Sequence, residues 1–112
     1  MTEFEGKRVF VTGSGAGIGK AISQMFIERG ARVVVSDIDE GAAAKTAEEI
    51  GAAGIANCDV SDESQVQSAV AQAVEILGGL DIVVNNAGIE VSSPLLQQST
   101  ESFDKIYAVN VK

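Results

Sequence analysis

Short runs of β-branched residues alternate with amphipathic stretches along this chain, and this alternation restricts its fold more than any other feature. The run "ARVVVSD" at residues 31–37 is typical, because its valines follow one another without intervening polar residues. Such a strand is buried on both faces, as in a parallel sheet covered by helices. The predicted strands are 7–12, 31–37, 54–60 and 80–88, and the predicted helices are 17–29, 39–50, 61–77 and one that begins at Thr100.

Strands that alternate with helices form β-α-β units, which predicts an α/β fold with a doubly wound parallel sheet. Right-handed crossovers place its four strands in the order 3-2-1-4. This order changes direction beside the first strand, and such sheets bind ligands at that point, beyond the carboxyl ends of the strands. We therefore expect a single domain over residues 1–112, with a ligand crevice between the ends of the first and fourth strands.

The predicted helices have recognisable ends. Ser61 is the expected N-cap of the third helix, and Gly51 and Gly78 are placed to end the second and third helices. After a loop over residues 89–99, a fourth helix is expected, and one of its faces would carry Phe103, Ile106, Tyr107 and Asn110.

Composition excludes several classes of protein. The chain has a net charge of −8 and no cluster of Lys or Arg, which argues against binding to nucleic acid or an anionic membrane. No apolar run is long enough to span a membrane, and the N-terminus "MTEFEGKR" lacks the apolar core of a secretion signal. There is no histidine and no spacing typical of zinc ligands, so no metal site is expected. Cys58 is the single cysteine, which agrees with a reducing compartment and a cytoplasmic protein.

Four glycines stand within the segment "TGSGAGIG" at residues 12–19, after the first predicted strand and at the start of the first predicted helix. A helix N-terminus offers unpaired backbone N–H groups and the positive end of the helix dipole, which together attract phosphate. The spacing is not the common G-x-G-x-x-G pattern, and it is not a triphosphate-binding loop, since Lys20 is followed by Ala21. We interpret the loop as a pyrophosphate site, and the alternative is a glycine-rich turn without a ligand.

An acidic residue follows the second predicted strand: Asp37, 24 positions after Gly13. At that place a carboxylate can accept hydrogen bonds from an adenosine ribose and would repel a 2′-phosphate. The neighbouring positions that could supply a positive charge hold Ser14 and Ile38 instead. NAD is therefore favoured over NADP, and the alternative is that Asp37 only begins the turn into the next helix.

Four motifs occur together along the chain: "TGSGAGIG" at 12–19, "CDVSD" at 58–62, "NNAG" at 85–88 and "VNV" at 109–111. With them the chain resembles the N-terminal portion of a short-chain dehydrogenase/reductase, a family with a Rossmann-type sheet. The resemblance implies that Asp37 holds the adenosine ribose and that Asn110 is the active-site asparagine. The cofactor-binding residues that it implies are Gly13, Ser14, Gly15, Gly17, Ile18, Gly19, Asp37, Ile38, Asp59, Val60, Asn86, Ala87 and Gly88.

The asparagines have alternative roles. Asn85 and Asn86 could simply cap a strand, because asparagine readily hydrogen bonds to nearby backbone. Asn110 could be a buried residue with a structural hydrogen bond. The resemblance also implies that Thr12 ties the first strand to the "NNAG" turn.

Members of the family carry a catalytic serine and a Tyr-x-x-x-Lys pair after the asparagine. This chain does not contain that pair, since Tyr107 and Lys112 are five positions apart. On a helix a separation of five turns the two side chains about 140° apart. The chain is therefore expected to be truncated to four strands and to be inactive on its own.

The predicted function is binding of NAD or another adenosine-containing ligand, in an enzyme class that transfers hydride between a hydroxyl or carbonyl compound and NAD. Three alternatives remain open: part of an oxidoreductase that another chain completes, a structural or self-assembling fragment without a ligand, and a methyltransferase-like nucleoside binder. The last does not explain "NNAG" or "VNV". As an apolar sheet edge, the strand at 80–86 is expected to cause self-association.

Overall fold

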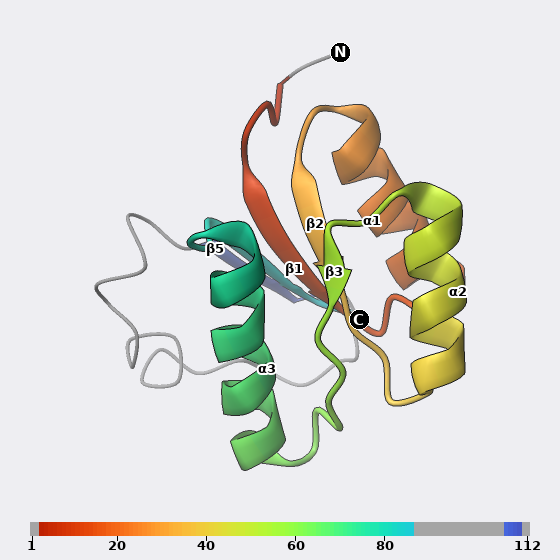
Figure 1. Cartoon of the computed structure of the whole chain (residues 1–112), viewed down its shortest axis with the longest axis vertical. Helices are drawn as coiled ribbons and strands as arrows, with labels where there is room; N and C mark the ends of the chain where they lie inside the picture. Colours follow the sequence, from red (N-terminus) through yellow and green to blue (C-terminus); the bar gives the residue numbers. More distant parts are fainter. Residues whose placement is uncertain (1–2, 87–106, 111–112) are drawn as a thin grey trace.

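The computed structural model describes residues 3–86 and 107–110, which form a parallel sheet between two layers of helix (Figure 1). The sheet has the strand order β3-β2-β1-β4-β5. The strands are β1 (Arg8–Thr12), β2 (Arg32–Val35), β3 (Gly54–Ile55), β4 (Ile82–Asn85) and β5 (Tyr107–Asn110), and the helices are α1 (Gly17–Glu28), α2 (Glu40–Ile50) and α3 (Glu63–Leu77). The predicted doubly wound α/β fold is confirmed, and its first four strands have the predicted order 3-2-1-4.

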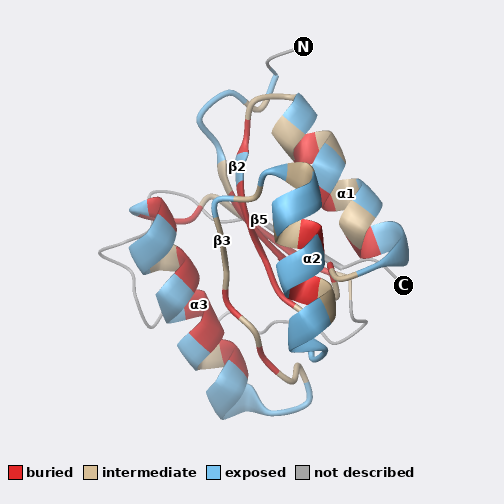
Figure 2. Cartoon of the chain, turned by 45° about the vertical axis from the view of Figure 1, so that its right-hand side comes forward, coloured by how far each residue is buried: buried red, intermediate tan, exposed pale blue. Residues whose placement is uncertain are grey.

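Alternation along the strands divides the core into two layers. In β1, Val9 and Val11 pack in one cluster with Phe26 of α1, whereas Phe10 packs in the other with Val70 of α3. This follows from strand geometry, because successive side chains point to opposite faces of a sheet. Helices α1 and α2 cover one face and α3 covers the other (Figure 1), and most residues of β1, β2 and β4 are buried between them (Figure 2).

Side chains and glycines fix where α2 begins and where α2 and α3 end. Asp39 is the N-cap of α2, and its carboxylate accepts a hydrogen bond from the Ala42 N–H at 3.0 Å. Gly51 and Gly78 follow α2 and α3 in the left-handed conformation, which glycine adopts without steric cost. Both predicted helix ends are confirmed.

The start of α3 differs from the prediction by one residue. Asp62 is the N-cap, and its carboxylate accepts a hydrogen bond from the Gln65 N–H at 3.2 Å. Ser61 was the expected cap, but its hydroxyl donates to Asp59 at 2.6 Å instead. The sequence "SDES" offers two capping side chains in succession, and only the second reaches the first turn of the helix.

Residues 107–110 form strand β5, so the predicted helix is wrong for these residues. The strand pairs in parallel with β4, with Asn110 opposite Asn85. The physical reason is tertiary: the free side of β4 presents backbone N–H and C=O groups, and pairing with another strand satisfies them. Residues 100–106 and the predicted loop at 89–99 lie outside the described residues.

Strand β4 is consequently not an edge of the sheet. It is paired with β1 on one side and with β5 on the other. The predicted self-association through the strand at 80–86 assumed an unpaired edge, and this assumption is wrong, because β4 is paired with strands of the same chain on both sides.

Candidate functional site

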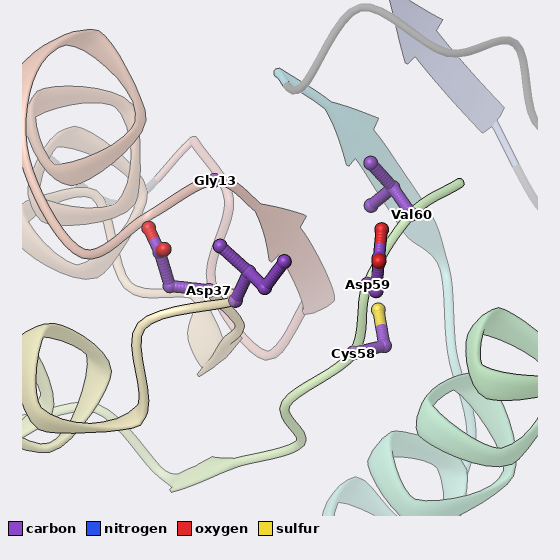
Figure 3. Close-up of a pocket in the computed structure, with 6 residues that line it drawn as sticks. Gly13, Asp37, Cys58, Asp59 and Val60 are labelled. Atoms are coloured by element: carbon purple, nitrogen blue, oxygen red, sulfur yellow. The ribbon is translucent and has the colours of Figure 1, made fainter. Parts of the chain in front are cut away.

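The carboxyl end of the sheet carries a pocket of about 240 Å³. It lies between the end of β2 and the segment 58–60 that follows β3, as Figure 3 shows. The lining residues are Gly13, Asp37, Ile38, Cys58, Asp59 and Val60. All but Cys58 are residues that the sequence predicts to bind a cofactor, so the fold brings three separate parts of the sequence to one place.

Two backbone N–H groups fix the Asp37 carboxylate at this pocket. The Gly15 N–H donates to Oδ2 at 2.9 Å, and the Asp39 N–H donates to Oδ1 at 3.0 Å. Because each carboxylate oxygen can accept two hydrogen bonds, each keeps the capacity for one more donor. Asp37 is therefore more than the first residue of the turn into α2, because its carboxylate also accepts a hydrogen bond from the glycine loop that follows the neighbouring strand β1.

The glycine loop brings the start of α1 very close to the end of β1. A Cβ atom on Gly19 would lie 2.0 Å from the Gly13 carbonyl oxygen, so only glycine fits there. The side chain of Asn86 donates to the same carbonyl at 3.1 Å. Ala16 is the N-cap of α1 and provides no side-chain cap, so the N–H groups of the first turn have no such acceptor.

Ser14 has a different place from the one predicted. It is fully buried, and its hydroxyl lies 3.0 Å from the Val11 carbonyl and 3.1 Å from the Ser36 carbonyl. The Ser36 N–H donates to the same hydroxyl at 2.8 Å. Ser14 therefore joins the ends of β1 and β2 from inside the protein, and we assign it no ligand contact.

The far wall of the pocket contains one ionised and one neutral group. Hydrogen bonds from the hydroxyl and the N–H of Ser61 lower the pKa of Asp59 below its ordinary value, so this carboxylate is charged at neutral pH. Burial raises the pKa of the Cys58 thiol, which stays protonated. Figure 3 shows both on the segment that faces Asp37.

Two large aliphatic side chains are exposed at the site. Ile18 in the first turn of α1 is 65% exposed, and Ile38 at the pocket is 70% exposed. Isoleucine is usually buried, so the exposed Ile38 offers an apolar surface to a ligand at the pocket, and Ile18 offers one at the start of α1.

The asparagines after β4 link this strand to β1. The Thr12 hydroxyl donates to the Asn85 side chain at 3.1 Å, which confirms the predicted tie. Asn86 reaches the loop after β1, so neither asparagine merely caps its own strand. Asn110 lies beside Asn85 at the carboxyl end of the sheet. Ala87 and Gly88 lie outside the described residues.

Two further residues support the site without having been singled out in the sequence. The Thr46 hydroxyl donates to the Gly15 carbonyl at 2.9 Å, and the Asn57 side chain accepts from the Asp37 N–H at 3.1 Å. A β-branched polar residue within the alanine-rich stretch 39–50 was the one available signal for Thr46. Nothing in the local sequence marks Asn57.

No group of three or more His, Cys, Asp or Glu among the described residues is placed to hold a metal ion. No helix formed by them has the length and apolar character needed to cross a membrane.

The site consists of backbone N–H groups, a fixed carboxylate and apolar surface. A doubly wound sheet with a glycine loop after β1 and an acid after β2 defines a class of dinucleotide-binding proteins.

Comparison with known proteins gives the family. A sequence model of the short chain dehydrogenases matches residues 7–112, and this chain belongs to that family. The sorbitol dehydrogenase of Cereibacter sphaeroides is 40% identical over 108 residues, which cover 96% of this chain and 42% of that protein.

Solved structures agree with this assignment. A hydroxysteroid dehydrogenase from Escherichia coli superposes with a TM-score of 0.70 and 41% identity, over 74% of this chain and 37% of that one. A short-chain type dehydrogenase/reductase from Mycobacterium marinum gives 0.71 and 36% identity, over 88% of this chain and 41% of that one. The chain thus spans less than half the length of these relatives.

Proposed function

We propose that this chain binds NAD and forms the cofactor-binding part of a short-chain dehydrogenase/reductase. The observation that carries the proposal is the Asp37 carboxylate, which two backbone N–H groups hold at a pocket while each oxygen can accept one more hydrogen bond. The two hydroxyls of an adenosine ribose are suitable donors. The family uses nicotinamide cofactors, which agrees with this assignment.

Charge favours NAD over NADP. A 2′-phosphate would stand where the ribose hydroxyl meets Asp37, and two anions at that distance repel. Position 38 is an exposed isoleucine and position 14 is a buried serine, so neither side chain carries a positive charge that would attract the phosphate. We therefore expect a preference for the cofactor without the phosphate.

The remaining groups of the dinucleotide have matching places. The adenine would lie between Ile38 and Val60, with the Asp59 carboxylate near its amino group. We assign the remaining contacts from the predicted cofactor-binding residues: pyrophosphate to Gly13, Gly15, Gly17, Ile18 and Gly19, and the nicotinamide side to Asn86, Ala87, Gly88 and Asn110.

The chemistry that belongs with such a site is hydride transfer between an alcohol or carbonyl compound and NAD. Residues 1–112 contain no Tyr-x-x-x-Lys pair. We therefore expect the 112-residue chain to bind the cofactor without reducing it. An increase in NADH absorbance with an alcohol substrate and this chain alone would contradict that expectation.

Titration calorimetry with NAD, NADP and ADP-ribose tests the binding proposal. We expect NAD and ADP-ribose to bind, and NADP to bind at least about tenfold more weakly. The variant Asp37→Ser should reduce this difference, because it removes the charge that repels the phosphate. Glu40→Gln is the matched control, since Glu40 is an exposed carboxylate near Asp37 that does not line the pocket. The absence of heat with both NAD and ADP-ribose would refute the proposal.

We also propose a reducing location such as the cytoplasm. The support is Cys58, which is a free, buried thiol. Thiol trapping in intact cells should find it reduced, and an oxidised Cys58 in a secreted fraction would contradict this location.

A further inference from the structure

Thr46 is a buried polar residue that the proposed cofactor contacts leave without a role. It lies within α2 and is 1% exposed. A threonine within a helix can bond to the carbonyl four residues before it. The Thr46 hydroxyl instead donates to the Gly15 carbonyl at 2.9 Å, 31 positions away along the chain. This hydrogen bond ties the middle of α2 to the glycine loop.

The Gly15 residue is held on three sides. Its N–H donates to Asp37, and its carbonyl accepts from Thr46. Its α-carbon faces α2 so closely that an added Cβ would lie 2.8 Å from the Cβ of Ala42. Gly15 therefore has little freedom to rotate as long as Asp37 and Thr46 both hold it.

The direction of the Gly15 carbonyl fixes the direction of the next N–H group. In a planar trans peptide the C=O and N–H bonds point in opposite directions. Because the Gly15 carbonyl points to Thr46 in α2, the Ala16 N–H points away from α2. None of the described residues accepts a hydrogen bond from this N–H, and Ala16 is exposed at the start of α1.

We propose that Thr46 is a positioning residue for the phosphate groups of the dinucleotide. Its hydroxyl holds the peptide between Gly15 and Ala16 with the N–H, and not the carbonyl oxygen, on the side where an anion meets the start of α1. A rotated peptide would present a partial negative charge to the phosphate. This inference rests on the proposed NAD binding, and it assigns to a residue of α2 an effect on the pyrophosphate that packing alone would not produce.

Calorimetry on two variants with two ligands tests this role. Thr46→Val keeps the shape of the side chain and removes the hydroxyl, whereas Thr46→Ser keeps the hydroxyl. We expect Thr46→Val to weaken ADP-ribose binding about five- to tenfold and to leave adenosine binding unchanged, because adenosine has no phosphate. Thr46→Ser should bind ADP-ribose like the unmodified chain.

The possible failures are distinguishable. If the unmodified chain binds neither ligand, the proposed function falls, and this inference falls with it. If the unmodified chain binds both but Thr46→Val weakens both equally, or weakens neither, or Thr46→Ser does not restore binding, only the positioning role is refuted.

A measurement on the unmodified chain covers the case in which Thr46→Val does not fold. In a two-dimensional ¹H–¹⁵N spectrum, ADP-ribose should shift the amide resonance of Ala16, and adenosine should leave it in place. An Ala16 resonance that responds equally to both ligands, or to neither, would overturn the proposal.

Discussion

The two ends of the sheet use their polar groups in opposite ways. At the amino end, the guanidinium of Arg8 donates two hydrogen bonds to the Asp81 carboxylate, at 2.9 and 3.0 Å. Arg8 and Arg32 also donate to the carbonyls of Gly78 and Leu77, at the C-terminus of α3. These polar groups bind one another and hold β1, β2 and α3 together.

At the carboxyl end, the same strands lead into groups that keep binding capacity. Asp37 is held in place but can accept further hydrogen bonds, and Ile38 is exposed beside it in the same pocket. One sheet thus carries two kinds of polar group: those at the amino end bind one another, whereas the Asp37 carboxylate at the carboxyl end can accept further hydrogen bonds. Mutations at the two ends should therefore have different effects.

The largest effect is expected at Gly19, which lies at the carboxyl end of the sheet and contributes both to stability and to the proposed ligand site. Gly19→Ala would place a methyl group 2.0 Å from the Gly13 carbonyl, so α1 must move away from β1. We expect the free energy of unfolding to fall by about 3 kcal/mol or more, together with loss of ADP-ribose binding. Urea denaturation and calorimetry measure the two effects.

Gly41→Ala is the matched control, because Gly41 also lies near the start of a helix. An added Cβ there meets its nearest neighbour, the Asp39 carboxylate, at 3.4 Å, which is an ordinary contact. We expect this variant to be as stable as the unmodified chain or slightly more so. Equal stability of the two alanine variants would show that the loop can move without cost.

The second effect lies at the amino end and depends on pH. Asp81→Asn removes the charge that Arg8 binds, and both side chains are mostly buried, so we expect a loss of about 2 kcal/mol at neutral pH. The hydrogen bonds from Arg8 lower the pKa of Asp81 below its ordinary value of 3.8 in the folded chain. The contribution is therefore complete above the ordinary pKa and is lost as the pH falls through the lower, folded-state pKa.

Urea denaturation at a series of pH values measures this dependence. The stability difference between Asp81→Asn and the unmodified chain should shrink in acid, while ADP-ribose affinity at neutral pH stays the same. Glu75→Gln, at an exposed position in α3, should leave the change of stability with pH in acid the same as in the unmodified chain. Weaker ligand binding in Asp81→Asn would mean that the two ends are coupled.

Much of this arrangement could be predicted from the sequence because it depends on local signals. The valines of 31–37 indicated a doubly covered strand, and Gly51 and Gly78 marked helix ends that the structure confirms. The glycine loop and Asp37 were also identifiable, because their spacing follows from a strand-loop-helix unit.

The remainder depends on contacts between distant parts of the chain. The segment 107–110 has helical periodicity with its upstream neighbours, but the hydrogen-bonding groups of β4 make it a strand. The hydrogen bond from Thr46 to Gly15 joins residues 31 positions apart, and no local pattern records it. Ser14 could not be placed either, since a serine in a glycine loop can face the ligand or the core.

The third effect separates binding from stability at the carboxyl end. Asp37→Asn keeps an acceptor for one N–H group but removes the negative charge and half of the acceptor capacity. We expect ADP-ribose affinity to fall about tenfold, which is about 1.4 kcal/mol, and the free energy of unfolding to change by less than about 1 kcal/mol. A loss of stability as large as that of Asp81→Asn would erase the contrast between the two ends.

The smallest effect concerns Lys20, a cation in the first turn of α1 close to the proposed phosphate site. Its Nζ lies 2.9 Å from Oε1 of Glu49. The side chain of Lys20 is 34% exposed and that of Glu49 is 44% exposed. Exposed ion pairs contribute little to stability, and the charge of Lys20 is already offset by its partner.

We therefore expect Lys20→Gln to leave both the urea midpoint and ADP-ribose affinity unchanged at physiological salt. Glu49→Gln is its matched control, because it would release Lys20 and should be equally silent. If ADP-ribose affinity falls in Lys20→Gln and rises in Glu49→Gln, Lys20 contributes its charge to the phosphate. Lys20 would then leave its ion pair with Glu49 to bind the phosphate. The ligand would be held by this charge as well as by the backbone N–H groups and the Asp37 carboxylate.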